Sequence, residues 1–378
     1  MTTLWLALGL AVSAARAADG PGVTAAPILQ VPMGSRALGM GGAFTAVGTD
    51  ASALYYNPAA MSRLNAHELS LSLLTGLADN TVQQIAYAGP TPLTGISGNG
   101  CTSAGASLLF AQNGTIEINR IGQDGSLESS QRVSAGSDFV ATAGYSERLA
   151  STAFPYKGRS YHVNHFFGAS GKMIRSTLAG GYSAQAYAAD AGYLAHAPEA
   201  RLSAGLSLLN LGTKLKFVSE GDPLPLTVRC GLAYQPRLPA IHSVTAAIDG
   251  DYLLHDKQGH ASVGVEYFWR RLYGLRMGYQ LLRDSMGLTM GFGLRWQNRF
   301  SLDYAWGMAE SLSGNHRFTA GYRFGAVTVA ARGRQRRTFI ESVPGREVIK
   351  GINDAAPAVE APPSRGRSTA GGIPGWIY

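Results

Sequence analysis

The stretch GLTMGFGLRW, residues 287–296, alternates strictly between two kinds of residue. One parity carries large apolar side chains, while the other carries glycine, threonine and arginine. Because successive side chains of a β-strand point to opposite faces, this period of two indicates a strand with one apolar face and one small or polar face. The apolar parity consists of Leu288, Met290, Phe292, Leu294 and Trp296.

The same alternation recurs from about Leu69 to Phe324, in segments of about ten residues separated by Gly, Asn, Asp or Pro turns. It is clearest in residues 69–73, 202–208, 300–306 and 317–324. About fifteen such segments can be drawn, and a barrel with both chain ends on one side needs an even number. The sequence therefore predicts an all-β fold, a transmembrane antiparallel β-barrel of about 14 strands.

Composition agrees with a membrane barrel and excludes a helical membrane protein. Glycine supplies 48 of the 378 residues, and charged residues make up only 15%. Outside the N-terminus there is no run of about 18 apolar residues. A soluble β-sandwich would alternate in the same way, but its strands commonly run only about five or six residues. Trp269, Trp296 and Trp306 fall toward segment ends, where aromatic rings meet a membrane–water interface.

The chain divides into four parts by composition. An apolar core at Leu4 to Val12, followed by small residues, predicts a signal peptide over residues 1–17 and export to the outer membrane of a Gram-negative-type bacterium. Residues 18–65 lie outside the strand rhythm, which predicts compact irregular structure, and the family resemblance given below implies that this part is an N-terminal hatch or plug. Residues 66–324 form the predicted barrel. Residues 325–378 are first basic and then rich in Pro and Ala, which predicts a disordered periplasmic tail.

The predicted plug carries a family signature. The run from Arg36 to Val47, RALGMGGAFTAV, is followed by Asp50 and then by Asn57-Pro58-Ala59-Ala60. This combination resembles the N-terminal signature of the PorV/PorQ family, a UPF0164-like branch of the FadL-type barrels. The resemblance implies a fourteen-stranded outer-membrane barrel whose N-terminal segment folds inward as a hatch. The hatch motif then comprises Arg36, Gly39, Gly41, Gly42, Asp50, Asn57, Pro58 and Ala59.

Four charged residues of the last strands share the parity opposite to the apolar residues, so they are expected to face the lumen. Their signs are mixed, which favours pairing across neighbouring strands over the one-sign ring of an ion-selective pore. The candidate polar network consists of Arg295, Asp303, Arg317 and Arg323.

No local motif indicates an enzyme, a metal or a cofactor. Gly39-Met40-Gly41-Gly42 lacks the G-x-G-x-x-G spacing of a nucleotide site, and the sequence has no P-loop and no G-x-S-x-G elbow. His162 and His165 would lie on opposite faces of a strand. The basic run at 332–337 lacks the interleaved aromatic residues of a nucleic-acid site. Cys101 and Cys230 are expected to be unpaired, although a bridge stays open.

Two functions are weighed nearly equally, with a purely structural surface barrel as the smaller remainder. In the first, the barrel passes small hydrophobic molecules, as the FadL-type resemblance implies. In the second, it resembles PorV and binds secreted cargo or a translocon component in type IX protein secretion. Expected partners are therefore outer-membrane lipid and either a hydrophobic small molecule or a secreted protein, with no nucleic acid.

Overall fold

The computed structural model describes residues 23–76, 80–98, 101–121, 127–156, 159–179, 181–281, 287–308 and 315–325, together with strands at 327–329, 337–343 and 346–350. The predicted signal peptide, residues 1–17, lies outside these ranges. So do residues 351–378 of the predicted tail.

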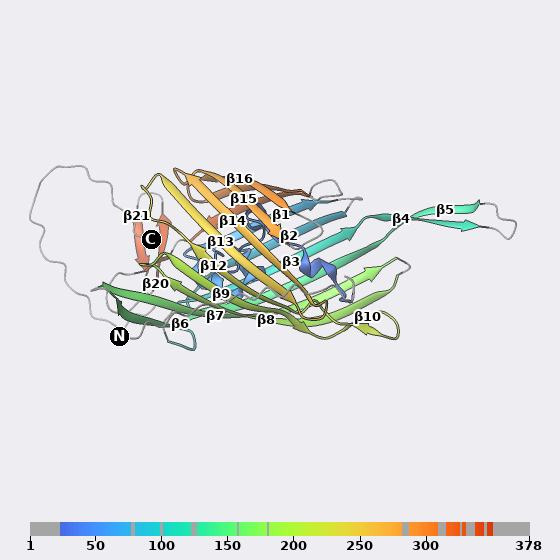
Figure 1. Cartoon of the computed structure of the whole chain (residues 1–378), viewed down its shortest axis with the longest axis horizontal. Coiled ribbons are helices and arrows are strands. Elements are labelled where there is room, and N and C mark those ends of the chain that lie inside the picture. Colours follow the sequence, from blue (N-terminus) through green and yellow to red (C-terminus); the bar gives the residue numbers. More distant parts are fainter. Residues whose placement is uncertain are drawn as a thin grey trace, which may run out of the picture.

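Fourteen antiparallel strands close into one barrel, which confirms the predicted fold class (Figure 1). Each strand pairs with its neighbour along the ring, and β1 pairs with β18 to close it, with His67 opposite Phe324. The barrel strands are β1 His67–Thr75, β2 Asn80–Thr91, β3 Thr102–Asn113, β6 Gly136–Tyr156, β7 Arg159–Leu178, β8 Ser183–Ala197, β9 Leu202–Gly212, β12 Thr227–Tyr234, β13 His242–Leu253, β14 Gln258–Trp269, β15 Tyr273–Leu281, β16 Leu288–Trp296, β17 Phe300–Gly307 and β18 Asn315–Phe324.

The alternation in the sequence separates an apolar outer face from a small and polar inner face. In β16, Phe292 is 44% exposed on the outside, whereas Gly293 next to it is buried. The outer face remains apolar around the ring, with Leu71 and Leu302 also exposed. Since each strand hydrogen-bonds on both sides, the wall has no free edge, and the inner face is left to receive other parts of the chain.

The barrel has two rims, which we name by the strand ends that they contain. The terminal rim holds the start of β1 at His67 and the end of β18 at Phe324, and the far rim holds the end of β1 at Thr75 and the start of β2 at Asn80. A hairpin of β4 (Thr115–Ile121) and β5 (Leu127–Ser134) projects well beyond the far rim (Figure 1).

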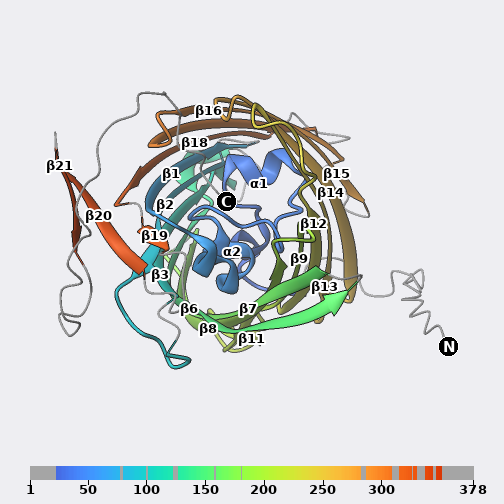
Figure 2. The ribbon, with the colours of Figure 1, turned by 90° about the vertical axis from the view of Figure 1, so that its left-hand side faces the viewer.

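Two smaller sheets lie beside the wall. The far rim also carries the two-stranded β10 (Leu215–Lys216) and β11 (Gly221–Asp222). A three-stranded sheet of β19 (Val327–Val329), β20 (Arg337–Val343) and β21 (Arg346–Lys350) follows the last barrel strand, and β20 and β21 lie outside the ring (Figure 2). Part of the predicted tail is therefore in strands.

The segment before β1 folds inside the ring, where α1 and α2 are enclosed by strands (Figure 2). Its short elements are η1 (Pro27–Gln30), α1 (Ser35–Gly39), α2 (Ala53–Tyr56) and η2 (Pro58–Arg63). Across the ranges described above, no helix has the length and apolar run needed to cross a membrane. We call residues 24–64 the inner segment.

Candidate functional site

The inner segment fills the barrel and contacts the wall on several sides. Helix α1 packs against β15 to β18, whereas η2 packs against β2, β3, β6, β7 and β8. Its large side chains are almost completely buried, with Phe44 at 0% and Tyr56 at 1% exposure, and their rings lie 5.4 Å apart. The backbone therefore runs through the interior on a core of its own rather than along a water-filled channel.

Cross-strand pairs of glycine form the seat of the inner segment on the wall. Gly264 of β14 lies opposite Gly278 of β15, and a Cβ on either one would come within 3.0 Å of the Met40–Gly41 backbone. Real Cβ atoms essentially never approach this closely, so any larger residue here would push the inner segment away. Gly41 itself has φ +67° and approaches the backbone of Val263 and Tyr279.

Three further glycine pairs repeat this arrangement around the ring. In each pair, a Cβ would collide with the inner segment: Gly205 and Gly168 face its backbone, and Gly105 and Gly144 face its side chains. With the first pair, the seat accounts for eight of the 48 glycines. The pairs and their contacts are Gly205–Gly231 against Thr45, Gly168–Gly192 against Pro58, and Gly105–Gly144 against Met61 and Leu54.

A buried chain of ion pairs joins the inner segment to the wall. The Arg36 guanidinium donates two hydrogen bonds to the Glu266 carboxylate, at 2.7 and 2.6 Å, and a third to Asp50 at 3.0 Å. Glu266 also accepts from Arg276 at 2.7 Å, and Arg276 donates to Asp303 at 2.7 Å. Five side chains thus alternate in charge from Asp50 to Asp303, so each buried charge has a partner.

The Arg36–Asp50 pair keeps both of its groups ionised. Burial lowers the pKa of the Arg36 guanidinium, but the Glu266 and Asp50 carboxylates together outweigh burial and raise that pKa above its ordinary value. Burial raises the pKa of the Asp50 carboxyl, but the Arg36 guanidinium, the Ser52 hydrogen bond and the Arg323 charge together outweigh burial and hold that pKa below its ordinary value. The pair is therefore an ionic attachment at any pH near neutrality.

A second set of polar contacts holds the backbone of the inner segment. The Asp249 carboxylate accepts hydrogen bonds from the backbone N–H groups of Phe44 and Thr45, each at 2.8 Å. Asn57 donates to the carbonyl oxygens of Thr45 and Tyr193, at 3.0 and 3.1 Å, and its side-chain oxygen accepts from the Ala59 N–H. These side chains supply partners to backbone groups of the inner segment at Phe44, Thr45 and Ala59.

The structure brings the predicted hatch residues together at this seat. Arg36 and Asp50 are in direct contact, and Asn57, Pro58 and Ala59 lie against Gly168 and Gly192 of the wall. Gly39 packs on Gly291, the Gly41 carbonyl accepts from Gln280, and the Gly42 carbonyl accepts from Arg229. Their assignment as a hatch motif remains a prediction about function.

The predicted lumen network does not pair within itself. Asp303 pairs with Arg276, and Arg323 donates to Glu68 at 2.6 Å. Arg295 stacks its guanidinium on the Phe268 ring at 4.1 Å, and Arg317 is buried with no acceptor for its Nη1 atom among the described residues. The sequence did not single out the wall residues that pair with the lumen arginines and with the inner segment, namely Glu68, Asp249, Glu266 and Arg276. Glu266 and Arg276 could have been found by strand parity, since each is a charged residue at an inward position between outward apolar residues.

One side of the far half of the interior, on strands β1 to β8, is apolar, whereas the opposite side carries buried polar groups such as Asp251, Gln280 and Arg317. The apolar side is lined by Leu109, Val140 and Ile174, and the start of the inner segment inserts Ile28 and Leu29 between them. The full apolar set, here called the far compartment, also includes Ala26, Met33, Leu74, Val82, Ala111, Ala184, Ala186, Ala188, Leu215 and Leu224.

The stretch that fills the far compartment is held by few polar contacts. The Ala25 N–H donates to the Pro223 carbonyl at 2.9 Å, and Thr24 donates to Asp256 at 2.9 Å. The Leu29 carbonyl accepts from the Tyr55 hydroxyl at 2.6 Å. No described charged side chain pairs with η1, in contrast to the ionic attachment at Arg36. Residues 24–33 are thus the more weakly attached part of the inner segment.

The fold is similar to that of solved transport barrels at low sequence identity. The Pseudomonas putida toluene transporter TodX matches with a TM-score of 0.51 at 13% identity, over 77% of this chain and 98% of that chain. A TodX deltaS2 mutant, described as a monoaromatic hydrocarbon channel, gives 0.50 at 14% identity, over 78% and 99%. A Pseudomonas aeruginosa FadL homologue gives 0.42 at 11% identity, over 78% and 99%. At these identities, the likeness to the TodX structures shows the fold alone.

The sequence itself matches one family. No curated protein matches it. The profile of an uncharacterised protein family, UPF0164, matches residues 9–237, which cover more than half of the 378 residues and include the whole inner segment. The chain therefore belongs to the uncharacterised protein family UPF0164.

Proposed function

We propose that this chain is a non-catalytic outer-membrane barrel that admits small hydrophobic molecules, with the inner segment as its plug. The observation that carries the proposal is the far compartment, an apolar patch on one side of a lumen that elsewhere buries polar groups. The solved barrel with a similar fold is described as a toluene transporter. An apolar small molecule is the class of ligand that such a compartment favours, because transfer from water is driven by the apolar area removed.

The outer face supports placement in a membrane. Large apolar side chains such as Leu71, Phe292 and Leu302 are about half exposed, and they continue from strand to strand. A water-soluble protein rarely exposes a contiguous apolar belt of this extent. Closed pairing of all fourteen strands also satisfies the wall's backbone groups without water, as lipid requires.

The two kinds of attachment suggest which part of the plug moves. The Arg36–Glu266 pair and the glycine seat fix residues 36–60 on the wall, so displacing them exposes buried charge. Residues 24–33 fill the far compartment through apolar contacts, which a ligand of similar character can replace at little net change in buried apolar area. An entering molecule would therefore displace η1 while the rest of the plug stays seated.

Binding of radiolabelled toluene and radiolabelled palmitate to the detergent-purified protein tests this proposal. The wild type is expected to bind one of these ligands saturably, and Ile174→Trp, which fills the far compartment, is expected to abolish that binding. Leu71→Trp, a matched change on the outer face, should bind like the wild type. The absence of saturable binding, or equal binding by both variants, would defeat the proposal.

A second candidate, a PorV-like role in binding secreted cargo for type IX secretion, is favoured by the β4–β5 hairpin. This hairpin stands clear of the barrel, and all of β4 is exposed, including Ile116 and Ile118. Replacing residues 115–134 with a short Gly-Ser linker should abolish cross-linking to a secreted cargo protein while leaving apolar ligand binding intact. A genome that encodes no type IX translocon component would eliminate this candidate.

A further inference from the structure

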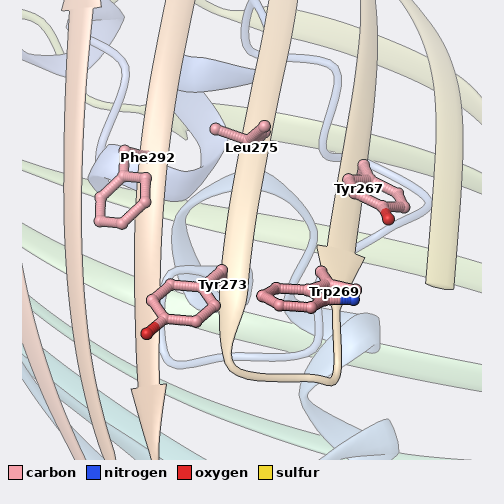
Figure 3. A pocket seen from close by; sticks show the side chains of 5 residues that line it. All are labelled: Tyr267, Trp269, Tyr273, Leu275 and Phe292. Carbon is pink, nitrogen blue, oxygen red and sulfur yellow. The ribbon is translucent and has the colours of Figure 1, made fainter. Parts of the chain in front are cut away.

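An open apolar groove runs down the outer wall from the terminal rim. Its first part, of about 550 Å³, is lined by Tyr267, Trp269, Tyr273, Leu275 and Phe292 from three neighbouring strands (Figure 3). A second part, of about 620 Å³, shares Tyr267 and Leu275 and continues along β14 and β15 to Tyr279 and Leu288. The two parts therefore form one continuous groove.

The floor of this groove is the outer side of the glycine seat. The Cβ positions of Gly264 and Gly278 point inward, so the outer face at these two residues presents backbone. Outward side chains such as Val265 and Met277 stand beside this floor and are about half exposed. The outer side of the seat is therefore a backbone floor between apolar side chains.

Along the membrane normal, the groove is about as long as one membrane leaflet is thick. From Tyr273 to Tyr279, β15 advances roughly 20 Å at the usual rise of a strand. With a strand tilt of about 45°, this corresponds to roughly 14 Å along the membrane normal, near half of a hydrocarbon core of about 30 Å. A single acyl chain that starts at the terminal rim would therefore fit along the groove to the bilayer midplane.

Aromatic and basic residues gather at the mouth of the groove. Trp269 and Tyr273 stack with ring centroids 5.8 Å apart, and the Arg270 guanidinium lies 5.1 Å above the Trp269 ring. Arg299 is exposed in the neighbouring turn of the same rim. The Arg295 N–H donates to the Leu272 carbonyl, which places the two turns side by side.

On the stretch of the terminal rim from β8 to β17, basic residues outnumber acidic ones. The turns of this stretch, at 198–201, 235–241, 270–272 and 297–299, contain five arginines and one glutamate, a net charge of +4. The far-rim loops at 213–226 and 254–257 contain three lysines and three acidic residues, a net charge of zero. A basic rim at the level of the headgroups attracts anionic lipid.

We propose that this groove is a binding site for one acidic glycerophospholipid, with an acyl chain along β14 and β15 and the headgroup phosphate at Arg270 and Arg299. Aromatic rings at the interface and guanidinium donors for phosphate are the groups that such a lipid requires. The inference rests on the outer-membrane placement proposed above, but not on the passage of any ligand through the barrel.

Native mass spectrometry of the full-length protein, titrated with dimyristoyl phosphatidylglycerol or dimyristoyl phosphatidylcholine, tests the site. The wild type should bind one phosphatidylglycerol in preference to phosphatidylcholine. The variant Arg270→Gln/Arg299→Gln should lose roughly 30-fold in affinity for phosphatidylglycerol, because each basic side chain near an anionic surface contributes about fivefold. Its affinity for phosphatidylcholine, whose phosphate charge is offset by the choline cation, should fall by a smaller factor.

Two further variants keep the test decisive. Met277→Trp fills the groove without removing charge and should weaken both lipids, whereas Arg237→Gln removes a rim arginine away from the groove and should behave as the wild type. Equal binding of the two lipids by the wild type, or equal loss in Arg237→Gln and Arg270→Gln/Arg299→Gln, would overturn the inference. Failure of the protein to float with lipid vesicles would instead refute the membrane placement itself.

Discussion

Replacing Arg36 with methionine should release the centre of the plug from the wall. The substitution removes the two hydrogen bonds to Glu266 and the one to Asp50, and it leaves the buried Asp50 carboxylate without its cation. Glu266 keeps Arg276 as a partner, so Asp50 bears most of the loss. Removing one partner of a buried pair costs about 3–5 kcal/mol, which corresponds to about 150- to 5,000-fold in the docking equilibrium.

Hydrogen exchange of the backbone amides measures this release directly. The N–H groups of Leu38, Gly42, Phe44 and Thr45 donate within the plug or to Asp249, so they exchange only when the plug opens. In Arg36→Met, their exchange should accelerate by the factor given above.

Two controls accompany this measurement. Arg120→Met on the projecting hairpin should leave the exchange of these amides unchanged, since Arg120 is exposed far from the plug. Adding Asp50→Asn to Arg36→Met removes the orphaned carboxylate and should restore part of the protection. Exchange in Arg36→Met within twofold of the wild type would refute the role assigned to the ion pairs.

Three further predictions concern the glycine seat, Asn57 and Asp50. Gly168→Ala places a Cβ against the Pro58 backbone and should lower the stability of plug docking by about 1–3 kcal/mol in the same exchange measurement, whereas Gly171→Ala in the same strand, with open space around it, should not. Asn57→Ala leaves two carbonyl groups and one N–H without partners and should lower docking by about 1–3 kcal/mol, with aspartate at this position failing to rescue it. Because Arg36 helps to hold the pKa of Asp50 below its ordinary value of 3.8, the contribution of Asp50 to plug docking is fully present above pH 3.8 and is lost only as the pH falls below that value. Exchange rates corrected for intrinsic pH dependence should show this loss in the wild type but not in Asp50→Asn. A loss of protection near pH 6 would contradict this prediction.

The fold could be predicted from the sequence because alternation reports which face of a strand meets which surroundings. Residues 287–296 assign Phe292 to the outside and Gly293 to the inside, as the structure has them. The number of barrel strands was harder to predict, because β4 alternates Ile116 and Ile118 with polar residues like a wall strand. Within the described residues β4 pairs with β5 alone, so it extends beyond the wall. A local pattern cannot distinguish a wall strand from a strand of a projecting hairpin.

The site could be predicted only in part, because its contacts join residues that are distant in the chain. The glycines and Asn57 of the inner segment were recognisable from local spacing. The partners of Arg36 and Arg323 were not, since Glu266 lies 230 residues from Arg36 and Glu68 lies 255 residues from Arg323. Only the strand register, with β1 closing on β18, brings such groups together.

The far compartment is proposed to receive an apolar molecule in place of residues 24–33. A crystal structure of the protein with bromobenzene tests this most directly, since bromine is located by its anomalous scattering. We expect a bromine peak among Leu109, Val140 and Ile174, with η1 displaced and Arg36 still paired with Glu266. Bromine found only on the outer wall, with η1 in place, would contradict the proposed entry of the ligand.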